Sequence, residues 1–403
     1  MNTNVSVSTF IHSETEYVDF LLDYAFQNNF SVAVWKLPYD TTRHLIISRK
    51  HQPLKRDAII LEELPAGFVF APFDRTKDSL FLEADYIFSF QDEKLKLSSD
   101  NPVAAASITW LEEQYKSLPS KKKKSYYTTS TNPTPGAGEN SFEKLVEIGV
   151  KEIEKGNLEK IVPSRTNTVS LSADFDIVEA FQKLCAAYPH ALVSFVSTPE
   201  SGSWLGASPE SLVHVQDKST FKTVALAGTK AYAEGTNLKS VAWTQKEIEE
   251  QALVERYIIS CFKKIRVREY EEHGPKTVVA GNLMHLRSDF TVDMKAINFP
   301  QLGTVMLQLL HPTSAVCGMP LEPALDFLCT HEKYDREFYA GFLGPVNISN
   351  SINVFVNLRC MKLSDNAATL YAGAGVTMDS LPEHEWAETE MKFNTLLNVL
   401  APL

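Results

Sequence analysis

The 403-residue chain contains no apolar run long enough to cross a bilayer, and its first twenty residues lack the basic start and apolar stretch of a signal peptide. We therefore expect a cytoplasmic protein. An excess of positive charge is also missing, since the formal net charge is −11. Because a protein that binds nucleic acid usually presents a basic face, we expect neither nucleic acid nor a membrane as a partner. A small anionic ligand is compatible with this charge, because a site can be locally positive or hold a metal.

Paired cysteines are absent as well. The five cysteines are odd in number, scattered and never spaced as C-x-x-C: Cys185, Cys261, Cys317, Cys329 and Cys360. This pattern argues against a disulfide framework or a zinc site and predicts reduced, mostly buried thiols. The glycine-rich segment AGAGV, residues 372–376, is not G-x-G-x-x-G and lacks a β–α–β setting. It gives little support to a nicotinamide or flavin cofactor, and its glycines favour a close approach of the backbone to another group.

The clearest break in composition is SLPSKKKKSYYTTSTNPTPGAGEN, residues 117–140. A lysine run followed by Ser, Thr, Pro and Gly residues cannot bury enough surface to order itself strongly. We therefore predict three parts: residues 1–116, which complete the fold, a flexible linker over 117–140, and the catalytic core over 141–403. The lysine run Lys121 to Lys124 is expected to be solvated.

The pattern of apolar residues predicts an α+β fold with sizeable sheets, because strands outnumber strict β–α–β units. Helices are predicted near 176–188, 244–265, 299–310, 321–330 and 382–399. Runs rich in β-branched residues predict strands at 31–38, 44–48, 160–171, 191–198, 203–208, 222–229, 276–281, 354–363 and 369–377.

Two of the predicted helices carry a Glu-x-x-Glu pair near their start. In the first, Thr244 can cap the helix, and Glu247 and Glu250 begin a stripe that becomes apolar after one turn. A capping box explains Glu247 without any function, but it does not explain Glu250 equally well.

The C-terminal helix repeats the design with Glu385 and Glu388, and Lys392 follows on the same face. A solvated face with an ordinary ion pair is one reading of this stripe. The other is that both Glu-x-x-Glu pairs converge on one hard cation, since carboxylate oxygens suit Mg²⁺.

Three basic residues lie in apolar strand-like runs. Arg165 and Arg359 must either turn outward or find an anion, and a planar guanidinium binds a carboxylate in a two-pronged manner. Lys160 opens the run KIVPSR. A lysine drawn into such a setting loses proton affinity through desolvation and can serve as a base, whereas an isolated lysine is usually structural.

Nine strings now occur in one order: KIVPSR, GASPESL, ALAGT, KEIEEQALV, LLHPTSAVCGMP, YDREFYAG, VNLR, YAGAGV and EWAETEMK. Together they resemble the chorismate-utilising enzymes, a family that includes isochorismate, salicylate, anthranilate and aminodeoxychorismate synthases. The resemblance covers residues 141–401. It implies the fold of anthranilate synthase component I, with two large sheets packed between helices, and with Mg²⁺ and chorismate in a central cleft.

The resemblance also implies roles for individual residues. Glu250 and Glu388 match the direct Mg²⁺ ligands, and Glu247 and Glu385 match carboxylates that orient metal-bound waters. The positions that match substrate-binding groups are Gly228, Thr229, His285, Tyr339, Arg359, Gly375 and Lys392. Among these, Arg359, Lys392 and the backbone of Gly375 would receive the substrate carboxylates.

Within the family, the residues favour isochorismate synthase. Ala227 stands in ALAGT where aminodeoxychorismate synthases commonly have a nucleophilic lysine. Lys160 matches the base that deprotonates the attacking water, and Glu210 matches the acid that protonates the departing hydroxyl. Two departures from the family pattern are Gln251, where histidine is usual, and Pro163, which can mark an edge or a bulge near Lys160.

Two other functions remain open at this point. One is salicylate synthesis, in which isochorismate formation is followed by pyruvate elimination. The other is a non-catalytic chorismate-binding subunit. We expect a monomer without an amidotransferase subunit, and a product that feeds menaquinone or siderophore synthesis, with menaquinone preferred.

Overall fold

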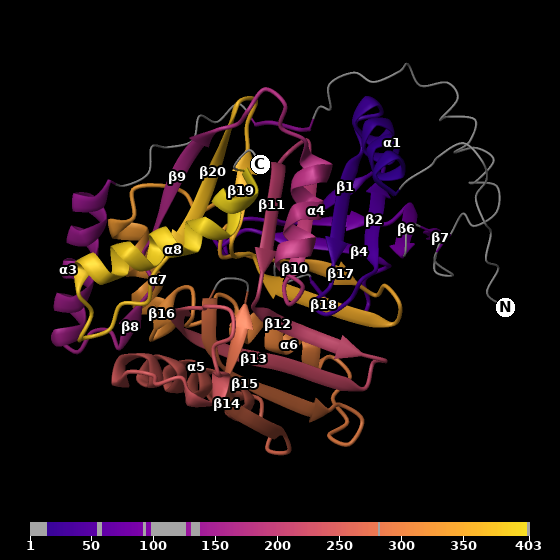
Figure 1. Ribbon diagram of the computed structural model, residues 1–403. Helices are drawn as coiled ribbons and strands as arrows, with labels where there is room; N and C mark the ends of the chain where they lie inside the picture. Colours follow the sequence, from indigo (N-terminus) through magenta and orange to yellow (C-terminus); the bar gives the residue numbers. More distant parts are fainter. Residues whose placement is uncertain are drawn as a thin grey trace.

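The computed structural model describes residues 14–54, 59–91, 94–97, 126–129, 138–280 and 283–400. Two nine-stranded antiparallel sheets dominate these residues (Figure 1). Sheet A has the order β7 (Lys94–Leu97), β6 (Tyr86–Gln91), β2 (Arg43–Ser48), β1 (Ser31–Lys36), β10 (Leu192–Thr198), β11 (Gly202–Ser208), β19 (Cys360–Leu363), β20 (Ala367–Gly373) and β9 (Ser164–Ser170).

Sheet B has the order β14 (Glu271–Ala280), β15 (Leu283–Asp293), β13 (Thr220–Ala231), β12 (Ser211–Gln216), β18 (Ser351–Val356), β17 (Phe342–Val346), β4 (Gly67–Ala71), β5 (Ser79–Glu83) and β3 (His51–Leu54). A two-stranded sheet pairs β16 (Gly318–Met319) with β8 (Lys160–Ile161). Strands from residues 31–97 form one end of sheet A and one end of sheet B, so the N-terminal part belongs to the same sheets as the rest of the chain.

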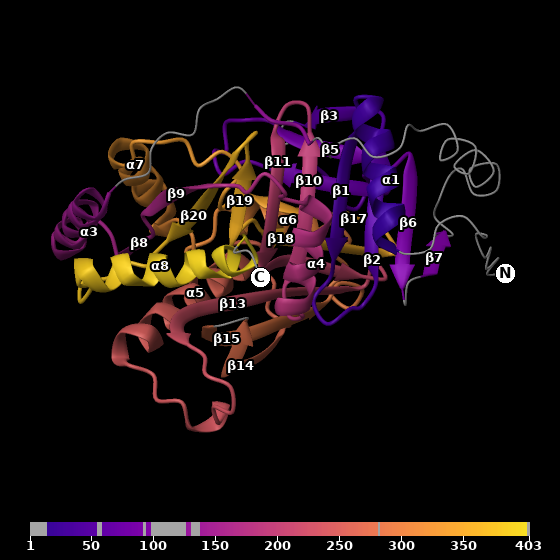
Figure 2. The ribbon, with the colours of Figure 1, turned by 45° about the horizontal axis from the view of Figure 1, so that its top comes forward.

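The α-helices in the described part of the chain are α1 (Glu14–Gln27), α3 (Glu139–Glu154), α4 (Ile177–Ala187), α5 (Gln245–Lys264), α6 (Leu302–Leu310), α7 (Leu321–His331) and α8 (Pro382–Leu400). The five predicted helices are confirmed as α4 to α8. Among the described residues, none of these helices is both long and apolar enough to cross a membrane. A loop with a 3₁₀ turn at Leu238–Ser240 connects β13 to α5 and projects from the body (Figure 2).

The core explains why β1 is buried along its whole length. Val32 and Val34 pack with α1, α4 and α8 on one face of sheet A. Ala33 and Trp35 point to the other face, where the Trp35 ring lies 5.3 Å from Phe68 of sheet B. A strand with apolar layers on both sides has no polar alternation, which is why β1 is continuously apolar between Ser31 and Lys36.

Most of the predicted linker, residues 117–125 and 130–137, lies outside the described residues, and so does the run Lys121 to Lys124. Residues 126–129 lie against the body, because the Tyr126 hydroxyl donates to Ser364 O at 3.0 Å and the Tyr127 hydroxyl to Phe30 O at 3.0 Å. Helix α3 begins at Glu139, so the last two residues assigned to the linker are helical.

Three predicted strands are wrong as continuous elements. The run 354–363 divides into β18 of sheet B and β19 of sheet A, and the run 160–171 divides into β8 and β9 with Pro163 between them. The run 369–377 ends as a strand at Gly373. Each run keeps strand-forming residues on both sides of the break, so residue type alone does not show where the backbone leaves a sheet. The other predicted strands are confirmed, except that Gly281 lies outside the described residues.

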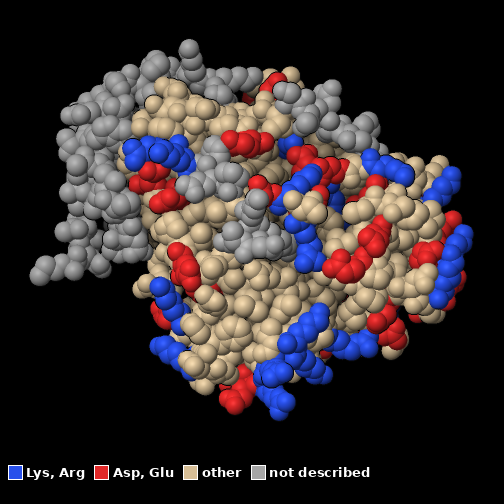
Figure 3. All heavy atoms as spheres, turned by 180° about the vertical axis from the view of Figure 1, so that it is seen from behind, with Lys and Arg blue, Asp and Glu red and all other residues tan. Residues whose placement is uncertain are grey.

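The cysteine prediction is confirmed. All five thiols are free, and all but Cys329 are buried. On the face seen in Figure 3, lysine and arginine are interspersed with aspartate and glutamate over the residues that are coloured.

Candidate active site

The site forms where the chain crosses twice between the two large sheets. Glu210 lies between β11 and β12, and Arg359 lies between β18 and β19. The crossings are hydrogen-bonded to each other, since Val356 N donates to Glu210 O at 3.0 Å and Ala207 N donates to Arg359 O at 3.0 Å. Arg359 has a left-handed backbone, with φ of 47°, which helps the chain turn from one sheet into the other. The two crossings therefore bring the Glu210 carboxyl group and the Arg359 guanidinium to one place.

One cavity collects most of the predicted site. Ten of the predicted residues line it: Glu210, Gly228, Thr229, Glu250, His285, Tyr339, Arg359, Gly375, Glu388 and Lys392. The remaining three, Lys160, Glu247 and Glu385, are not among its lining residues. The sequence positions that carried the resemblance thus meet in space, although they are scattered over more than 180 residues of the chain.

Lys160 lies directly behind the cavity wall. Its side chain is fully buried, and Nζ donates to Glu250 Oε1 at 2.8 Å. The backbone on both sides of Lys160 is fixed, because Ile161 exchanges two hydrogen bonds with Val376. Burial alone would raise the pKa of Glu250, but Lys160 and neighbouring lysines lower it. Glu250 is therefore held as a carboxylate at the wall.

Gly375 is required by this arrangement. A Cβ atom at this position would lie 2.3 Å from Glu250 Oε1 and 3.2 Å from Lys160 Cε. Neither atom belongs to a side chain that can move away freely, because the two are bonded to each other inside the protein. The glycine in AGAGV thus permits the close approach that the sequence predicted, and it is the α5 carboxylate that approaches.

Helix α8 supplies the second carboxylate of the cavity. Lys392 Nζ donates to Glu388 Oε1 at 2.6 Å and to Gly373 O at 2.7 Å. The predicted i,i+4 ion pair therefore exists, but it lies in the cavity wall and not on a solvated face.

Arg165 holds helix α8 to sheet A, because its guanidinium lies 3.4 Å from the centre of the Trp386 ring and Nε donates to Thr389 Oγ1 at 2.7 Å. Arg165 is thus a structural residue.

Glu385 is buried beneath this wall. Its side chain is fully buried, Oε1 accepts from Lys246 Nζ, and Oε2 has no hydrogen-bond partner. Burial and the neighbouring Glu388 raise the pKa of Glu385 to about 7, although Lys246 opposes this shift. An unpartnered, buried carboxylate oxygen costs free energy unless a cation or a donor satisfies it.

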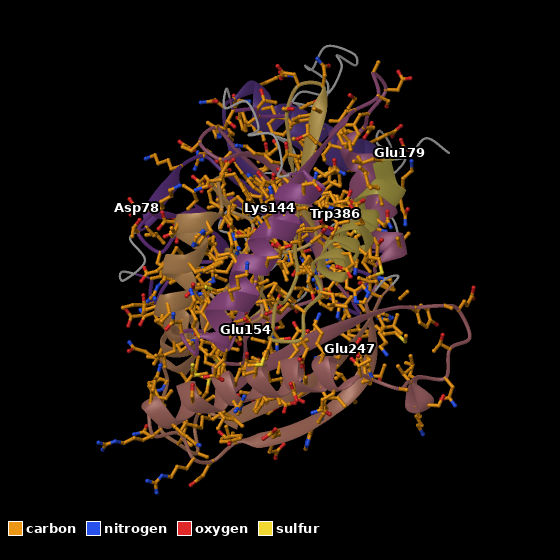
Figure 4. The ribbon with its side chains drawn as sticks, turned by 90° about the vertical axis from the view of Figure 1, so that its left-hand side faces the viewer. Asp78, Lys144, Glu154, Glu179, Glu247 and Trp386 are labelled. Atoms are coloured by element: carbon orange, nitrogen blue, oxygen red, sulfur yellow. The ribbon has the colours of Figure 1, made fainter. Side chains whose placement is uncertain are left out.

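Glu247 has a different role. Its Oε2 accepts from Thr244 N at 2.6 Å and from Thr244 Oγ1 at 2.6 Å, which is the predicted capping box. Lys230 Nζ lies 3.7 Å from the same oxygen. Figure 4 shows Glu247 at the start of α5 and Trp386 on α8, with α3 beside α8 on the same side of the molecule.

The donor set fits a hard cation. Glu250, Glu388 and Glu385 each pair with a different lysine, and all three carboxylates act electrostatically on Lys246, so they lie around one region. Within the described ranges, no three His, Cys, Asp or Glu side chains lie close enough together to bind one metal ion jointly. Carboxylates without His or Cys favour Mg²⁺ over zinc, and Mg²⁺ needs few protein ligands because it keeps several waters.

Glu210 has the properties of a general acid. Its side chain is buried, and Thr313 Oγ1 donates to Oε1 at 3.2 Å. Burial raises the pKa of Glu210 to about 7, against smaller opposing effects of Thr313 and Lys160. A carboxyl group with this pKa holds its proton near neutral pH and can release it to a leaving group.

His285 presents an acceptor to the cavity. Its Nδ1 lies 2.6 Å from Gly228 O, and because a carbonyl can only accept, Nδ1 carries the proton. Nε2 is therefore unprotonated, and it is buried with no hydrogen-bond partner. Burial lowers the pKa of His285 to about 3, which keeps the ring neutral. It can accept a hydrogen bond from a hydroxyl group or a water molecule.

The aromatic part of the wall is Tyr339, whose ring stacks on Tyr371 with centroids 5.4 Å apart. Ala227 also lines the cavity, so no lysine projects there from ALAGT. Gln251, which departs from the family pattern, is buried outside the cavity lining and donates to Glu255 Oε1 at 3.1 Å.

Sequence reasoning missed Lys246 and Thr313. Thr313 belongs to HPTSAVCG, which carried the resemblance, but nothing in that string indicates a bond to Glu210. Lys246 lies four residues before Glu250 in α5, which places both on one helical face. That spacing was the available signal.

Comparison with known proteins shows the class to which this fold and cavity belong. The chain belongs to the chorismate binding enzyme family, whose family model matches residues 63–401. It is 30% identical over 264 residues to isochorismate synthase EntC of Escherichia coli K12, which covers 64% of this chain and 66% of that protein. It is 28% identical to isochorismate synthase MenF of the same strain, over 68% of this chain and 63% of that protein. These alignments span just under two thirds of each relative.

Solved structures show the same fold over nearly the whole chain. The menaquinone-specific isochorismate synthase MenF of E. coli superposes with a TM-score of 0.73 at 22% identity, covering 94% of this chain and 91% of that one. Anthranilate synthase component I from Streptococcus pneumoniae gives a TM-score of 0.67 at 18% identity, covering 93% and 85%. The predicted α+β fold of the anthranilate synthase component I type is confirmed.

Proposed function

We propose that this chain is an isochorismate synthase that converts chorismate into isochorismate with Mg²⁺. The observation that carries the proposal is the content of one cavity. It contains a buried acid, Glu210, two cationic side chains, Arg359 and Lys392, and carboxylates from two separate helices. The relatives named isochorismate synthase support the same reaction.

Chorismate is a ring-shaped dianion, and its two carboxylates need separate receivers. Arg359 offers a planar fork of donors for one of them, while Lys392 and the backbone at Gly375 lie on another part of the same wall. Tyr339, Gly228 and Thr229 line the cavity around the ring position. His285 Nε2 accepts a hydrogen bond from a substrate hydroxyl or from a water molecule.

Glu250 and Glu388 would hold Mg²⁺ directly, and the ion would supply positive charge to a substrate carboxylate. Glu385 would orient its waters through the oxygen that has no partner. We give Glu247 a smaller part of this role, because its Oε2 is engaged in the capping box.

In the reaction, water attacks C2 of the ring and Lys160 takes a proton from that water. The new C2–O bond forms, the double bonds shift, and the C4–O bond breaks. Glu210 gives its proton to the departing hydroxyl, which leaves as water. The hydrogen bond from Lys160 Nζ to Glu250 Oε1 holds the Lys160 side chain in place behind the cavity wall. The acid and the base gain from being fixed in one site.

Ala227 lines the cavity wall, so the ALAGT segment offers no lysine that could attack the ring covalently, and we propose water as the attacking group. We propose that no amidotransferase subunit takes part and that the chain works as a monomer in the cytoplasm. Menaquinone-specific and 2,3-dihydroxybenzoate-specific isochorismate synthases share this fold. We propose that the product feeds menaquinone or siderophore synthesis.

The test is to incubate purified protein with chorismate and Mg²⁺ and to separate the products by chromatography. Isochorismate should form, and Lys160→Ala and Glu210→Ala should each abolish its formation. Lys155→Ala, which changes an exposed lysine, should not. Absence of turnover, or turnover that survives both active-site changes, would refute the proposal. Salicylate as the main product would favour the salicylate-forming alternative, and chorismate binding without turnover would favour a binding subunit.

A further inference from the structure

Lys246 is the most exposed of the three lysines that pair with Glu250, Glu388 and Glu385. It lies in the first turn of α5, its side chain is 25% exposed, and Nζ donates to the fully buried Glu385. Burial alone would lower the pKa of Lys246, but Glu385, Glu388 and Glu250 raise it. Lys246 lies one helical turn before Glu250 on α5, and Glu385 lies one turn before Glu388 on α8, so the bond between Lys246 and Glu385 brings these two helix faces together.

The other two lysines are fixed in a way that Lys246 is not. Lys160 is fully buried on Glu250, and Lys392 is bound both to Glu388 and to Gly373 O. Lys246 reaches Glu385 from the solvent side on a flexible stem of four carbons. It can withdraw into water without breaking the packing of the core.

Glu385 shows that the region is built for more positive charge than Lys246 supplies. Its Oε2 is buried and has no hydrogen-bond partner, whereas its Oε1 is used by Lys246. An ammonium group is a single charge that satisfies one of these oxygens. A divalent ion with its shell of waters can satisfy both of them and the facing carboxylates.

We propose that in the metal-free protein the Lys246 ammonium stands in for the divalent cation among Glu385, Glu388 and Glu250, and that it leaves Glu385 when the cation binds. The inference rests on the proposed Mg²⁺ site. Lys246 prevents three carboxylates from facing one another without a counter-charge. It also lowers the affinity for the metal, because its own bond to Glu385 must break first.

The direct test is Lys246→Met, which keeps the length of the side chain and removes its charge. Lys263→Met is the matched control, because Lys263 is an exposed lysine in the last turn of the same helix. Calorimetric titration of Mg²⁺ without substrate should show that Lys246→Met binds the ion at least tenfold more tightly than the wild type, which is about 1.4 kcal/mol. The metal-free Lys246→Met protein should melt at a lower temperature than the control.

An affinity that is unchanged or weaker in Lys246→Met than in Lys263→Met would overturn the inference. A weaker affinity would show that Lys246 positions Glu385 for the metal. A wild-type protein that binds no Mg²⁺ would overturn it as well.

A second measurement uses the wild-type protein and does not depend on how a variant folds. An amine-acetylating reagent followed by mass spectrometry reports how accessible each lysine is. Saturating Mg²⁺ should increase the labelling of Lys246 and leave Lys263 unchanged. Labelling of Lys246 that stays constant or falls would contradict release from Glu385.

Turnover of chorismate by the wild-type protein separates this inference from the proposed function. If isochorismate forms while Lys246→Met shows no gain in affinity, only the role of Lys246 fails. If the wild-type protein binds Mg²⁺ as predicted but forms no isochorismate, the proposed function fails and the role of Lys246 stands.

Discussion

Helices α5 and α8 carry the same Glu-x-x-Glu spacing, yet their first glutamates do different things. Glu247 turns back to Thr244 and closes a capping box, while Glu385 is fully buried and accepts a hydrogen bond from Lys246. The reason is an offset of one residue. Glu247 is the third residue of α5 and Glu385 is the fourth residue of α8, and only the third position reaches the capping residue. Equal spacing therefore sets a shared helical face but not a shared function.

The second glutamates behave alike, and changing them should have the largest effect. Glu250→Gln and Glu388→Gln each remove a carboxylate charge from the cavity and from the lysine paired with it, Lys160 or Lys392. We expect kcat/KM for chorismate to fall by about a thousandfold or more, as for loss of a group that stabilises charge in the reacting state. Steady-state kinetics at saturating Mg²⁺ measures this.

The matched control is Glu249→Gln, which changes an exposed glutamate of α5 between the two helical positions in question. It should stay close to the wild type. If Glu388→Gln retained full activity while Glu250→Gln lost it, the two helices would not be equivalent partners.

Gly375→Ala tests the position of the α5 carboxylate and of Lys160, which is hydrogen-bonded to it. The added Cβ atom would lie 2.3 Å from Glu250 Oε1, so Glu250 must move while Glu388 keeps its own bonds. We expect kcat/KM to fall by about a hundredfold, since displacements near 1 Å at a reacting centre have this effect. Gly138→Ala is the control, because a Cβ atom there meets nothing within 4 Å. Wild-type rates in both variants would show that Glu250 does not need its present place.

The pH dependence of the rate tests Glu210, the acid that lines the cavity. Burial raises the pKa of Glu210 to about 7, and only the protonated form can supply a proton to the leaving hydroxyl. The rate should therefore fall as pH rises above about 7, approaching tenfold per pH unit. Rates measured from pH 6 to 9 give this limb. In Glu210→Gln the residual rate should show no such limb, and an unchanged limb would assign it to another group.

Changing the first glutamate of each pair should have the smallest effects. For Glu385 the main effect should be on Mg²⁺ binding, and for Glu247 it should be on stability. Glu385→Gln should weaken Mg²⁺ binding by about tenfold, because it removes a buried carboxylate near the ion. Glu247→Gln should lower the free energy of unfolding by about 1 kcal/mol through the weakened cap, with a smaller change in Mg²⁺ affinity than Glu385→Gln. Calorimetry and urea unfolding measure the two quantities. Equal losses of affinity would mean that Glu247 reaches the ion despite its capping bonds.

The sequence contained more about these helices than about the strands between them. The α5 and α8 boundaries follow from caps and helical periodicity, which are local, and the prediction comes within two residues at each end. Pro163 indicated an irregularity where β8 gives way to β9. The crossing at Arg359 could not be predicted, because a run of strand-forming residues looks the same whether it stays in one sheet or crosses to another.

In the site, too, local patterns could be predicted and long-range contacts could not. Ten of the thirteen residues assigned to the site by the family pattern line one cavity, while Lys160, Glu247 and Glu385 do not. The Lys246–Glu385 pair joins residues 139 positions apart, and no local pattern encodes that contact. The burial that raises the pKa of Glu210 likewise follows from packing between distant segments.

The most direct test of the account is a crystal structure of the protein soaked with Mn²⁺, which substitutes for Mg²⁺ and gives an anomalous signal. We predict one strong anomalous peak in the cavity, within coordination distance of both Glu250 and Glu388, with Lys246 turned away from Glu385. A peak bound to only one of the two helices, or located outside the cavity, would contradict the claim that α5 and α8 share one cation.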